Sequence, residues 1–417
     1  MSPVKVPIKA SMNTIEFRLR EFNTGSFPRG LSLMLGMVSQ WIYDKDPIEG
    51  VTFESALADL KADIAAGKPI FQDLLKKYFV ENEHRVIVEM KPDFELEKKV
   101  IAEEESRLAK LKENMSTQQI NEVIEATKRL KEAQLAEDSP EAKATLPRLG
   151  LEDIEKKSTE LPIEIKRLGS QSDDGVTVLT HSVLSNGILY AEVAFDFSSL
   201  DDEDLPYLPL FSRMLMESGT TNYDDVALSR KIGAETGGVG TSYITDVKSN
   251  HGKIANPDDL ILYLMIKGKA VADKIPVMMD IFHDVLLNAK LDNQKRALEM
   301  LKESKIRKET SVITSGHTFA ATRLAARFSF LGYLAEKTGG ITSVRDAGYL
   351  ITQVESDWAS VQARLEKIRE KIIRKGSVVV NLTADDKTLD IAMPAVDKFL
   401  ETLPERCADK GLSLIHI

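Results

Sequence analysis

Histidine, cysteine and carboxylate side chains are the residues of this chain that could hold a metal or activate a water molecule. A zinc peptidase places two histidines on one helix turn, with a glutamate beside the metal to take a proton from its water. Neither His-Glu-x-x-His nor the inverted His-x-x-Glu-His occurs in the sequence. No two of the six histidines lie within five residues of each other: His84, His181, His251, His283, His317 and His416. The sequence therefore predicts no catalytic residue and no metal ligand in this chain.

Three groups of residues approach such a site without completing it. Glu81-Asn-Glu-His84 has Glu and His at helical spacing, but it lacks a second histidine and runs into a strand-like segment, so it indicates a surface turn. His283 follows the apolar pair Ile281-Phe282, which is typical of a hydrogen-bonded histidine on a helix. Ser315-Gly-His317 stands at a predicted helix start, where free N–H groups could bind an anion, although simple capping explains the same residues.

Covalent and nucleotide chemistry have no better support. Cys407 lies in a polar tail without a nearby histidine, so a thiol nucleophile is not expected. The glycines between Gly233 and Gly240 match neither the GxxxxGKS/T phosphate loop nor GxGxxG after a strand. They indicate instead the end of a helix followed by the start of a strand.

Composition and charge narrow the class of protein. Of the 417 residues, 43% are apolar and 29% are charged, which is an ordinary balance for a globular protein. The net charge of −10 argues against a nucleic-acid partner and is compatible with basic peptide ligands. A single cysteine allows no intrachain disulfide, so a reducing compartment is expected. No apolar run approaches the roughly 18 residues of a membrane span, so no membrane partner is expected, and no targeting segment is recognised.

The elements that would position a site divide the chain into four parts: 1–93, 94–155, 156–406 and 407–417. The first part is mainly helical and is expected to be the C-terminal part of an α+β domain. Its segment Leu31–Tyr43 is apolar on nearly every side, as a buried helix would be, and helices are also expected at 54–65 and 69–79. His84–Met90 alternates as a half-buried strand does.

The second part is rich in Glu and Lys and carries two narrow apolar stripes at helical spacing. Between the stripes, Ser116-Thr-Gln-Gln119 has the pattern of a capping box. We therefore expect two long helices in a hairpin, with each stripe sealing one helix against the other. A hinge between two larger lobes and an ordinary surface arm are both consistent with this pattern.

The third part mixes strands with helices and is expected to be a complete α+β domain. Two strands, 176–180 and 189–197, flank the hairpin signal Ser185-Asn-Gly187. Further strands are expected at about 238–247, 260–270 and 378–382, and helices at about 203–218, 223–235, 274–288, 292–310, 317–331, 343–375 and 388–402. This order predicts helices packed on one face of a largely antiparallel sheet, preceded by the long helical hairpin. The fourth part is a tail that reads as artefactual.

Several stretches resemble the presequence protease family, the organellar branch of the pitrilysin/insulysin-type zinc metallopeptidases. They occur in the family's order, from about residue 10 to residue 405. The stretches that carry the resemblance are Ser11–Phe17, Asn23–Leu35, Trp41–Asp44, His84–Met90, Leu189–Leu200, Ser315–His317, Ala320–Arg323 and Val379–Asp385.

The resemblance implies a LuxS/MPP-like metallopeptidase fold within a larger protein. In that family two halves, each of two α+β domains, close around a chamber and are joined by a helical hairpin. Zinc is held by a His-x-x-Glu-His helix of the first domain, and an Arg and a Tyr of the last domain assist the substrate. The resemblance also implies degradation of presequences and other short unfolded peptides, in the mitochondrial matrix and in plastids.

On this resemblance the chain corresponds to the end of the second domain, the hairpin and the third domain. The zinc motif is then expected upstream of Met1, and the distal Arg and Tyr downstream of Ile417, in the remaining halves of the same polypeptide. The chain alone is expected to bind no zinc and to cleave no peptide. A truncated gene is the favoured explanation of its ends. The alternative is a stand-alone, non-catalytic scaffold or partner subunit with a helical arm.

Overall fold

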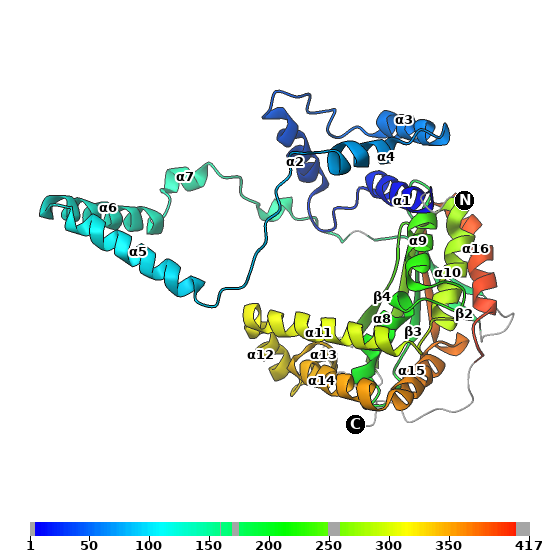
Figure 1. Cartoon of the computed structure of the whole chain (residues 1–417). Coiled ribbons are helices and arrows are strands. Elements are labelled where there is room, and N and C mark those ends of the chain that lie inside the picture. The colour runs from blue at the N-terminus through cyan, green and yellow to red at the C-terminus, as the bar shows by residue number, and fades with distance from the viewer. Residues whose placement is uncertain (1–4, 159, 169–174, 249–258, 406–417) are drawn as a thin grey trace. The chain divides into compact units, whose positions relative to one another are not determined.

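A six-stranded sheet is the framework of the region that follows residue 160 (Figure 1). The computed structural model describes residues 5–158, 160–168, 175–248 and 259–405. In spatial order the strands are β1 (Glu164–Leu168), β2 (Val176–Ser182), β6 (Val378–Ala384), β3 (Ile188–Asp196), β5 (Leu260–Val271) and β4 (Val239–Val247). The pair β2–β6 is parallel, and the other four pairs are antiparallel.

Alternation along the strands gives one face of the sheet to the core. Val193 of β3 opposes Ile266 of β5 and Val380 of β6, and all three side chains are buried in one layer. Tyr190 and Glu192 point to the opposite face, where they are half-buried. Helices α10 (Ile275–Leu287) and α16 (Asp386–Glu401) cover the apolar face (Figure 1). The predicted α+β fold, with helices on a largely antiparallel sheet, is confirmed.

The remaining helices of this region pack around the same core. They are η3 (Leu205–Tyr207), α8 (Leu208–Glu217), α9 (Asp225–Glu235), η5 (Ala272–Lys274), α11 (Gln294–Thr314), α12 (Gly316–Ala325), α13 (Phe330–Gly339), α14 (Ile341–Ser356), α15 (Trp358–Ile372) and η6 (Lys375–Ser377). The glycine-rich segment does join a helix to a strand, since α9 ends at Glu235 and β4 begins at Val239.

Two long helices of the prediction are each divided in the structure. The predicted helix 343–375 breaks at Asp357, whose side chain accepts a hydrogen bond from the Ser360 N–H and so starts α15. The predicted helix 317–331 breaks before Ser329, which caps α13 in the same way through the Gly332 N–H. A capping side chain satisfies free N–H groups at a new helix start, and apolar periodicity alone does not register that.

The predicted hairpin between β2 and β3 is wrong, although its turn is present. Asn186 and Gly187 adopt the positive φ angles of 55° and 75° that such a turn needs. However, β6 lies between the two strands and pairs with both. Asp385, which follows β6, accepts hydrogen bonds from the Ser185 hydroxyl and the Gly187 N–H. The turn therefore receives a distant strand end, which a local turn signal cannot reveal.

Contacts divide the chain into two compact units, residues 1–57 with 161–417, and residues 58–160. In the first unit α1 (Lys5–Glu21) packs on α9, and Glu21 accepts hydrogen bonds from the Tyr190 hydroxyl and the Lys269 ammonium group. The helix α2 (Arg29–Trp41) forms where it was predicted, but the expectation that it is buried is wrong. Its apolar side chains have too few apolar neighbours in the described part of the chain to leave water.

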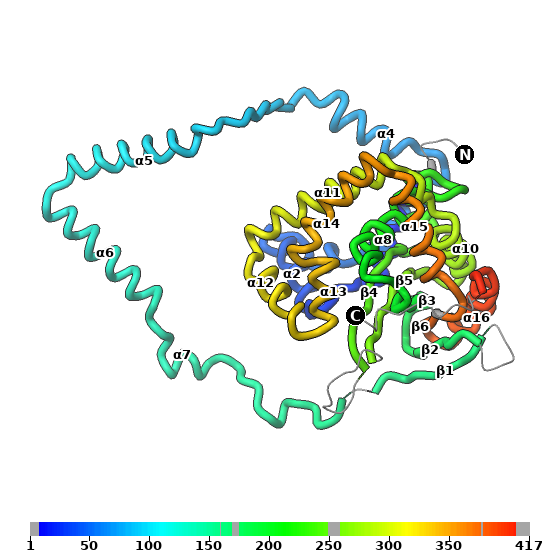
Figure 2. The backbone as a smooth tube through the Cα atoms, turned by 90° about the horizontal axis from the view of Figure 1, so that it is seen from below, coloured from blue at the N-terminus to red at the C-terminus, as the bar shows by residue number. Residues whose placement is uncertain are grey.

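Residues 58–160 contain helices and extended segments and, within the described residues, no strand (Figure 2). The elements are α3 (Glu54–Ala65), which begins in the preceding unit, α4 (Ile70–Leu75), a π-helical turn (Lys76–Val80), α5 (Leu96–Glu113), α6 (Thr117–Leu135), α7 (Pro140–Ala144) and η2 (Leu151–Asp153). The predicted strand His84–Met90 is absent, and Ile87 is 92% exposed. A strand persists only when a neighbour accepts its hydrogen bonds, and no described strand lies beside this segment.

The capping box between the two long helices is confirmed. Ser116 accepts a hydrogen bond from the Gln119 N–H, and the Gln119 side chain accepts one from the Ser116 N–H. The expected sealing of the apolar stripes is wrong, since Leu108 of α5 and Ile124 of α6 remain at least half exposed. Two helices offer too little apolar surface to bury both stripes. The predicted domain limits 1–93, 94–155 and 156–406 stay a prediction. None of the described helices combines the length and the apolar character that crossing a membrane requires.

Candidate functional site

The histidines named in the sequence analysis lie apart in the described structure. His84 is exposed in an extended segment, and His317 is exposed in the first turn of α12. The His283 Nδ1 lies 2.9 Å from the Thr402 hydroxyl, so the predicted hydrogen-bonded helix histidine is confirmed. Ser315 makes no side-chain capping bond to α12, so simple capping by this serine is wrong. His251, Cys407 and His416 lie outside the described residues.

No three His, Cys, Asp or Glu side chains converge on one point within residues 5–158, 160–168, 175–248 and 259–405. The described residues therefore do not fit a zinc site. That the chain as a whole holds no metal ligand stays a prediction.

A buried carboxylate, Asp204, belongs to the framework and not to a reaction centre. It is fully buried and accepts hydrogen bonds from Arg364 at 2.7 Å and from Lys371 at 3.2 Å. Burial acts to raise the pKa of Asp204, but the bonds from Arg364 and Lys371 outweigh it, and the pKa lies below its usual value. A carboxylate that stays charged between two cations fixes the start of η3 against α15 and offers no proton to a substrate.

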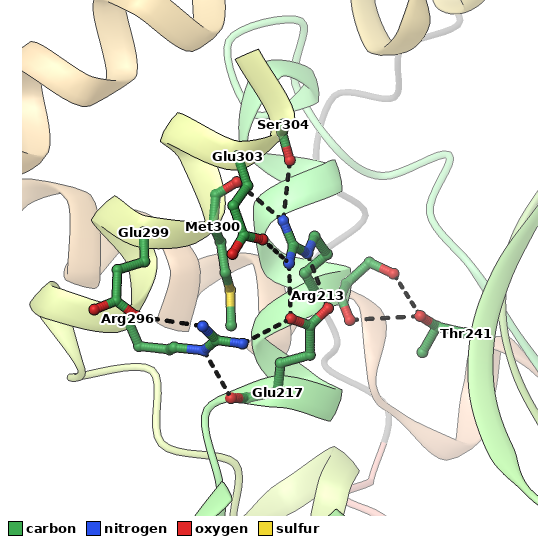
Figure 3. A network of polar contacts seen from close by, with 9 residues as sticks. Arg213, Glu217, Thr241, Arg296, Glu299, Met300, Glu303 and Ser304 are labelled. Carbon is green, nitrogen blue, oxygen red and sulfur yellow. Dashed lines mark hydrogen bonds and ion pairs between the residues drawn. The ribbon is translucent and has the colours of Figure 1, made fainter. Parts of the chain in front are cut away.

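A second polar network fastens α11 to α8 (Figure 3). The Arg213 guanidinium donates to both carboxylate oxygens of Glu217, at 2.9 and 2.7 Å, and to the Met300 carbonyl oxygen at 2.9 Å. It also donates to Glu303 at 3.0 Å. The hydrogen bond from Arg213 holds the pKa of Glu217 below its usual value, so the pair stays charged.

The same helix α8 is tied to strand β4. The hydroxyls of Ser212 and Thr241 lie 2.8 Å apart (Figure 3), and the Tyr243 hydroxyl donates to the Leu208 carbonyl oxygen at 2.8 Å. The Tyr243 ring meets the Phe197 ring edge to face, with centroids 6.2 Å apart. Burial raises the pKa of the Tyr243 phenol, so it stays a neutral donor. The Arg213 network thus positions α8, and α8 positions β4.

Beside β4 lies a cavity of about 360 Å³, which we call the β4 groove. Figure 2 shows β4 and α13 side by side around it. One wall comes from the sheet and from α8, and the other from α12 and α13. The lining residues are Phe197, Leu208, Tyr243, Thr245, Thr322, Leu334, Ala335, Thr338 and Gly339. The walls are mainly apolar, which suits an apolar side chain more than a charged one.

The outer edge of β4 has backbone groups with no strand to receive them. The Lys248 N–H donates to the Asp259 carbonyl oxygen at 2.7 Å, and these two residues continue the register in which Val247 faces Leu260. Hydrogen-bonded pairs alternate along an antiparallel ladder, so the even-numbered residues of β4 bond to β5. The N–H and C=O groups of Thr241, Tyr243 and Thr245 therefore point away from β5, and no described strand lies beyond them.

The two edges of the sheet differ in how they are protected. β1 has five residues, among them three charged ones, and it follows Pro162 closely. Short length, charge and proline all discourage a further strand from pairing. β4 has nine residues and is uncharged up to Asp246, and its side chains from Tyr243 to Asp246 are exposed. The sequence predicted this strand but not its edge position. The signal for it was the weak contrast between Thr241, Tyr243 and Thr245 and the residues that alternate with them.

Fold and site together define a class of protein: an α+β layer domain whose open strand edge runs beside an apolar groove. Comparison with known proteins makes this specific. The chain belongs to the family described as peptidase M16, subfamily C, associated, whose model matches residues 90–347. This confirms the resemblance to presequence proteases, and with it a place among peptidase M16 proteins.

Individual relatives agree with this assignment. Presequence protease 1, chloroplastic/mitochondrial, from Arabidopsis thaliana is 38% identical over 400 residues, which are 95% of this chain and 36% of that protein. Protein HypA from Clostridium perfringens is 30% identical over 91% of this chain and 38% of its own length. The mitochondrial presequence protease of Xenopus laevis is 22% identical over 94% of this chain and 36% of its own length. The chain thus spans little more than a third of the length of these relatives.

Proposed function

We propose that this chain is part of a zinc metalloendopeptidase that degrades presequences and other short unfolded peptides. The observation that carries the proposal is the 38% identity, over 95% of the chain, to a protein named presequence protease. The names of the relatives include the words mitochondrial and chloroplastic, which supports the mitochondrial matrix and the plastid as compartments.

Zinc belongs, in this proposal, to other parts of the complete enzyme. The described residues offer no group of three ligands, so we assign to this chain neither the metal nor the base that activates its water. Its residues would contact the peptide away from the reacting atoms. The remaining halves of the same polypeptide would supply the chemistry.

Within that enzyme we assign residues 156–406 to the wall of the peptide chamber, and residues 94–155 to the hinge. The β4 groove supports the first assignment, because a wall that meets unfolded peptides needs an accessible apolar site. The exposed stripes of α5 and α6 support the second, because such surfaces are typical of a segment that contacts other parts of a larger protein.

A chimaera tests the proposal. The 400 matching residues of the Arabidopsis relative would be replaced by this chain, and degradation of a fluorogenic peptide would be measured beside the unaltered relative. We expect the chimaera to cleave the peptide and the isolated chain not to. Zinc content and a thermal melt show whether the chimaera has folded.

A folded, zinc-loaded chimaera without activity would contradict the proposal and favour a non-catalytic scaffold or partner subunit. Cleavage by the isolated chain, with one zinc bound per chain, would contradict the assignment of the metal to other parts of the enzyme.

A further inference from the structure

We propose that β4 binds an extended peptide by strand addition, and that the peptide it takes alternates apolar residues with lysine or arginine. This inference rests on the proposed function for the class of ligand, an unfolded peptide. It adds the site on this chain and the sequence pattern that the site selects.

The backbone of β4 supplies the first part of the argument. Thr241, Tyr243 and Thr245 direct their N–H and C=O groups outward, where no described strand receives them. An added strand would exchange hydrogen bonds with these three residues in the pattern of an antiparallel or parallel ladder. A partner of about five residues, roughly 17 Å long, spans them. Main-chain pairing of this kind accepts many sequences, as degradation of varied peptides requires.

The β4 groove supplies the second part. In strand addition, a peptide residue opposite Tyr243 places its side chain on the same face of the sheet as the Tyr243 ring. That face opens into the groove between β4 and α13, where Phe197, Leu208 and Leu334 form apolar walls. Every second peptide residue is therefore directed toward the groove, and an apolar side chain there leaves water without losing a hydrogen bond.

Charge on the opposite face supplies the third part. Asp246 of β4 and Asp196 of β3 lie on that face, and each accepts a hydrogen bond from a backbone N–H group, of Val247 and Ser198 respectively. The two lysines of β5 on the same face are already paired, Lys267 with Glu192 and Lys269 with Glu21. The open carboxylates thus favour a basic side chain on the peptide residues that alternate with the apolar ones.

A proline in β4 separates strand addition from other ways of binding. Thr245 directs its N–H outward, so Thr245→Pro removes a donor from the open edge and leaves the ladder with β5 intact. Thr245→Val keeps that donor and serves as the matched control. Asp246→Asn tests the charged face separately, because it keeps the size of the side chain and removes its charge.

The experiment uses the full chain and a fluorescein-labelled nine-residue peptide of alternating leucine and lysine, with fluorescence anisotropy as the readout. A peptide of the same composition, with its leucines and lysines in two blocks, is the control ligand. We expect the alternating peptide to bind more tightly than the block peptide. Thr245→Pro should weaken binding about tenfold, the scale of one lost backbone hydrogen bond, and Thr245→Val less than twofold. Asp246→Asn should weaken binding of the lysine peptide, and not of a peptide with glutamine in place of lysine.

Hydrogen exchange gives a readout that does not depend on a variant that folds poorly. The amides of Tyr243 and Thr245 should exchange more slowly when the alternating peptide is present. Unchanged exchange at both amides, or equal binding of the alternating and block peptides, would overturn the inference. So would a Thr245→Pro variant that melts like the parent chain and binds as tightly. Binding needs no zinc, so peptide binding with an inactive chimaera would contradict the proposed function alone, and an active chimaera without strand addition would contradict this inference alone.

Discussion

Residues 161–405 and residues 58–160 place their apolar side chains in opposite environments. In the first region the core includes fully buried rings such as Phe195 and Phe211. In the second, no helix has a buried residue, and Phe79 is 72% exposed. The first region has a sheet to collect the apolar faces of its helices, whereas the second has helices alone among its described residues. The difference teaches that an apolar pattern creates a need for burial, and that a second layer is required to meet it.

The largest expected effect comes from shortening a phenylalanine in each region. Phe211→Ala removes a fully buried ring of α8 and should lower the free energy of unfolding by about 3–5 kcal/mol. Phe79→Ala should change it by less than about 0.5 kcal/mol. The measurement is denaturant unfolding followed by Trp358 emission, because Trp358 packs against the core, in a Trp41→Phe background that removes the exposed tryptophan. Equal losses in the two variants would break the comparison and show that Phe79 is buried in solution.

A smaller effect is expected from arginine in the two regions. Arg213→Met leaves the carboxylates of Glu217 and Glu303 without that partner and should cost about 2 kcal/mol, the scale of hydrogen bonds to charged groups. Arg107→Met breaks an exposed pair with Glu104, which is worth at most about 0.5 kcal/mol. The same tryptophan emission reports both variants. If Arg213→Met costs no more than Arg107→Met, the network does not fasten α11 to α8.

Helix caps should separate the regions by the reach of their effect. Ser116→Ala and Asp224→Ala each remove a side chain that accepts from a backbone N–H at the start of a helix, α6 and α9 respectively. Such a loss costs about 1 kcal/mol. In α6, which has no buried residue, only the local amides around Gln119 should exchange faster. In α9, which packs on α10, the melting temperature of the whole region should fall. A global shift from Ser116→Ala would contradict the separation.

The sequence predicted the type of most elements, and the reason is local. Leu31–Tyr43 and the segment that forms α10 both read as apolar helices, and both are helices. Only α10 is buried, because strands distant in the chain form the surface on which it packs. Likewise the strand at 238–247 was predictable from its residues, whereas its place at the edge depends on which strands pair elsewhere. The β4 groove could not be predicted, since its walls come from segments about 80–90 residues apart.

The smallest expected effect concerns acid, and it tests whether the strand insertion at Asp385 ties the first region together. Hydrogen bonds from the Thr388 hydroxyl, the Gly187 N–H and the Ser185 hydroxyl lower the pKa of Asp385 to about 2, below its ordinary value of about 3.9. Because the folded pKa is the lower one, the contribution of Asp385 to stability is fully present above pH 3.9 and is lost as the pH falls toward 2.

Asp385→Asn should therefore lower the melting temperature at pH 5, and the difference from the parent chain should shrink between pH 4 and pH 2. The matched residue of the other region is Asp93, whose pKa is lowered chiefly by the hydrogen bond from Lys99. Asp93 lies in an exposed segment, so Asp93→Asn should leave the Trp358 transition unchanged across the same pH range. An Asp385→Asn variant whose deficit is constant from pH 5 to pH 2 would mean that Asp385 acts through the shape of its side chain and not through its charge. The turn between β2 and β3 would then be held by packing, and the electrostatic link between β6 and the turn would be wrong.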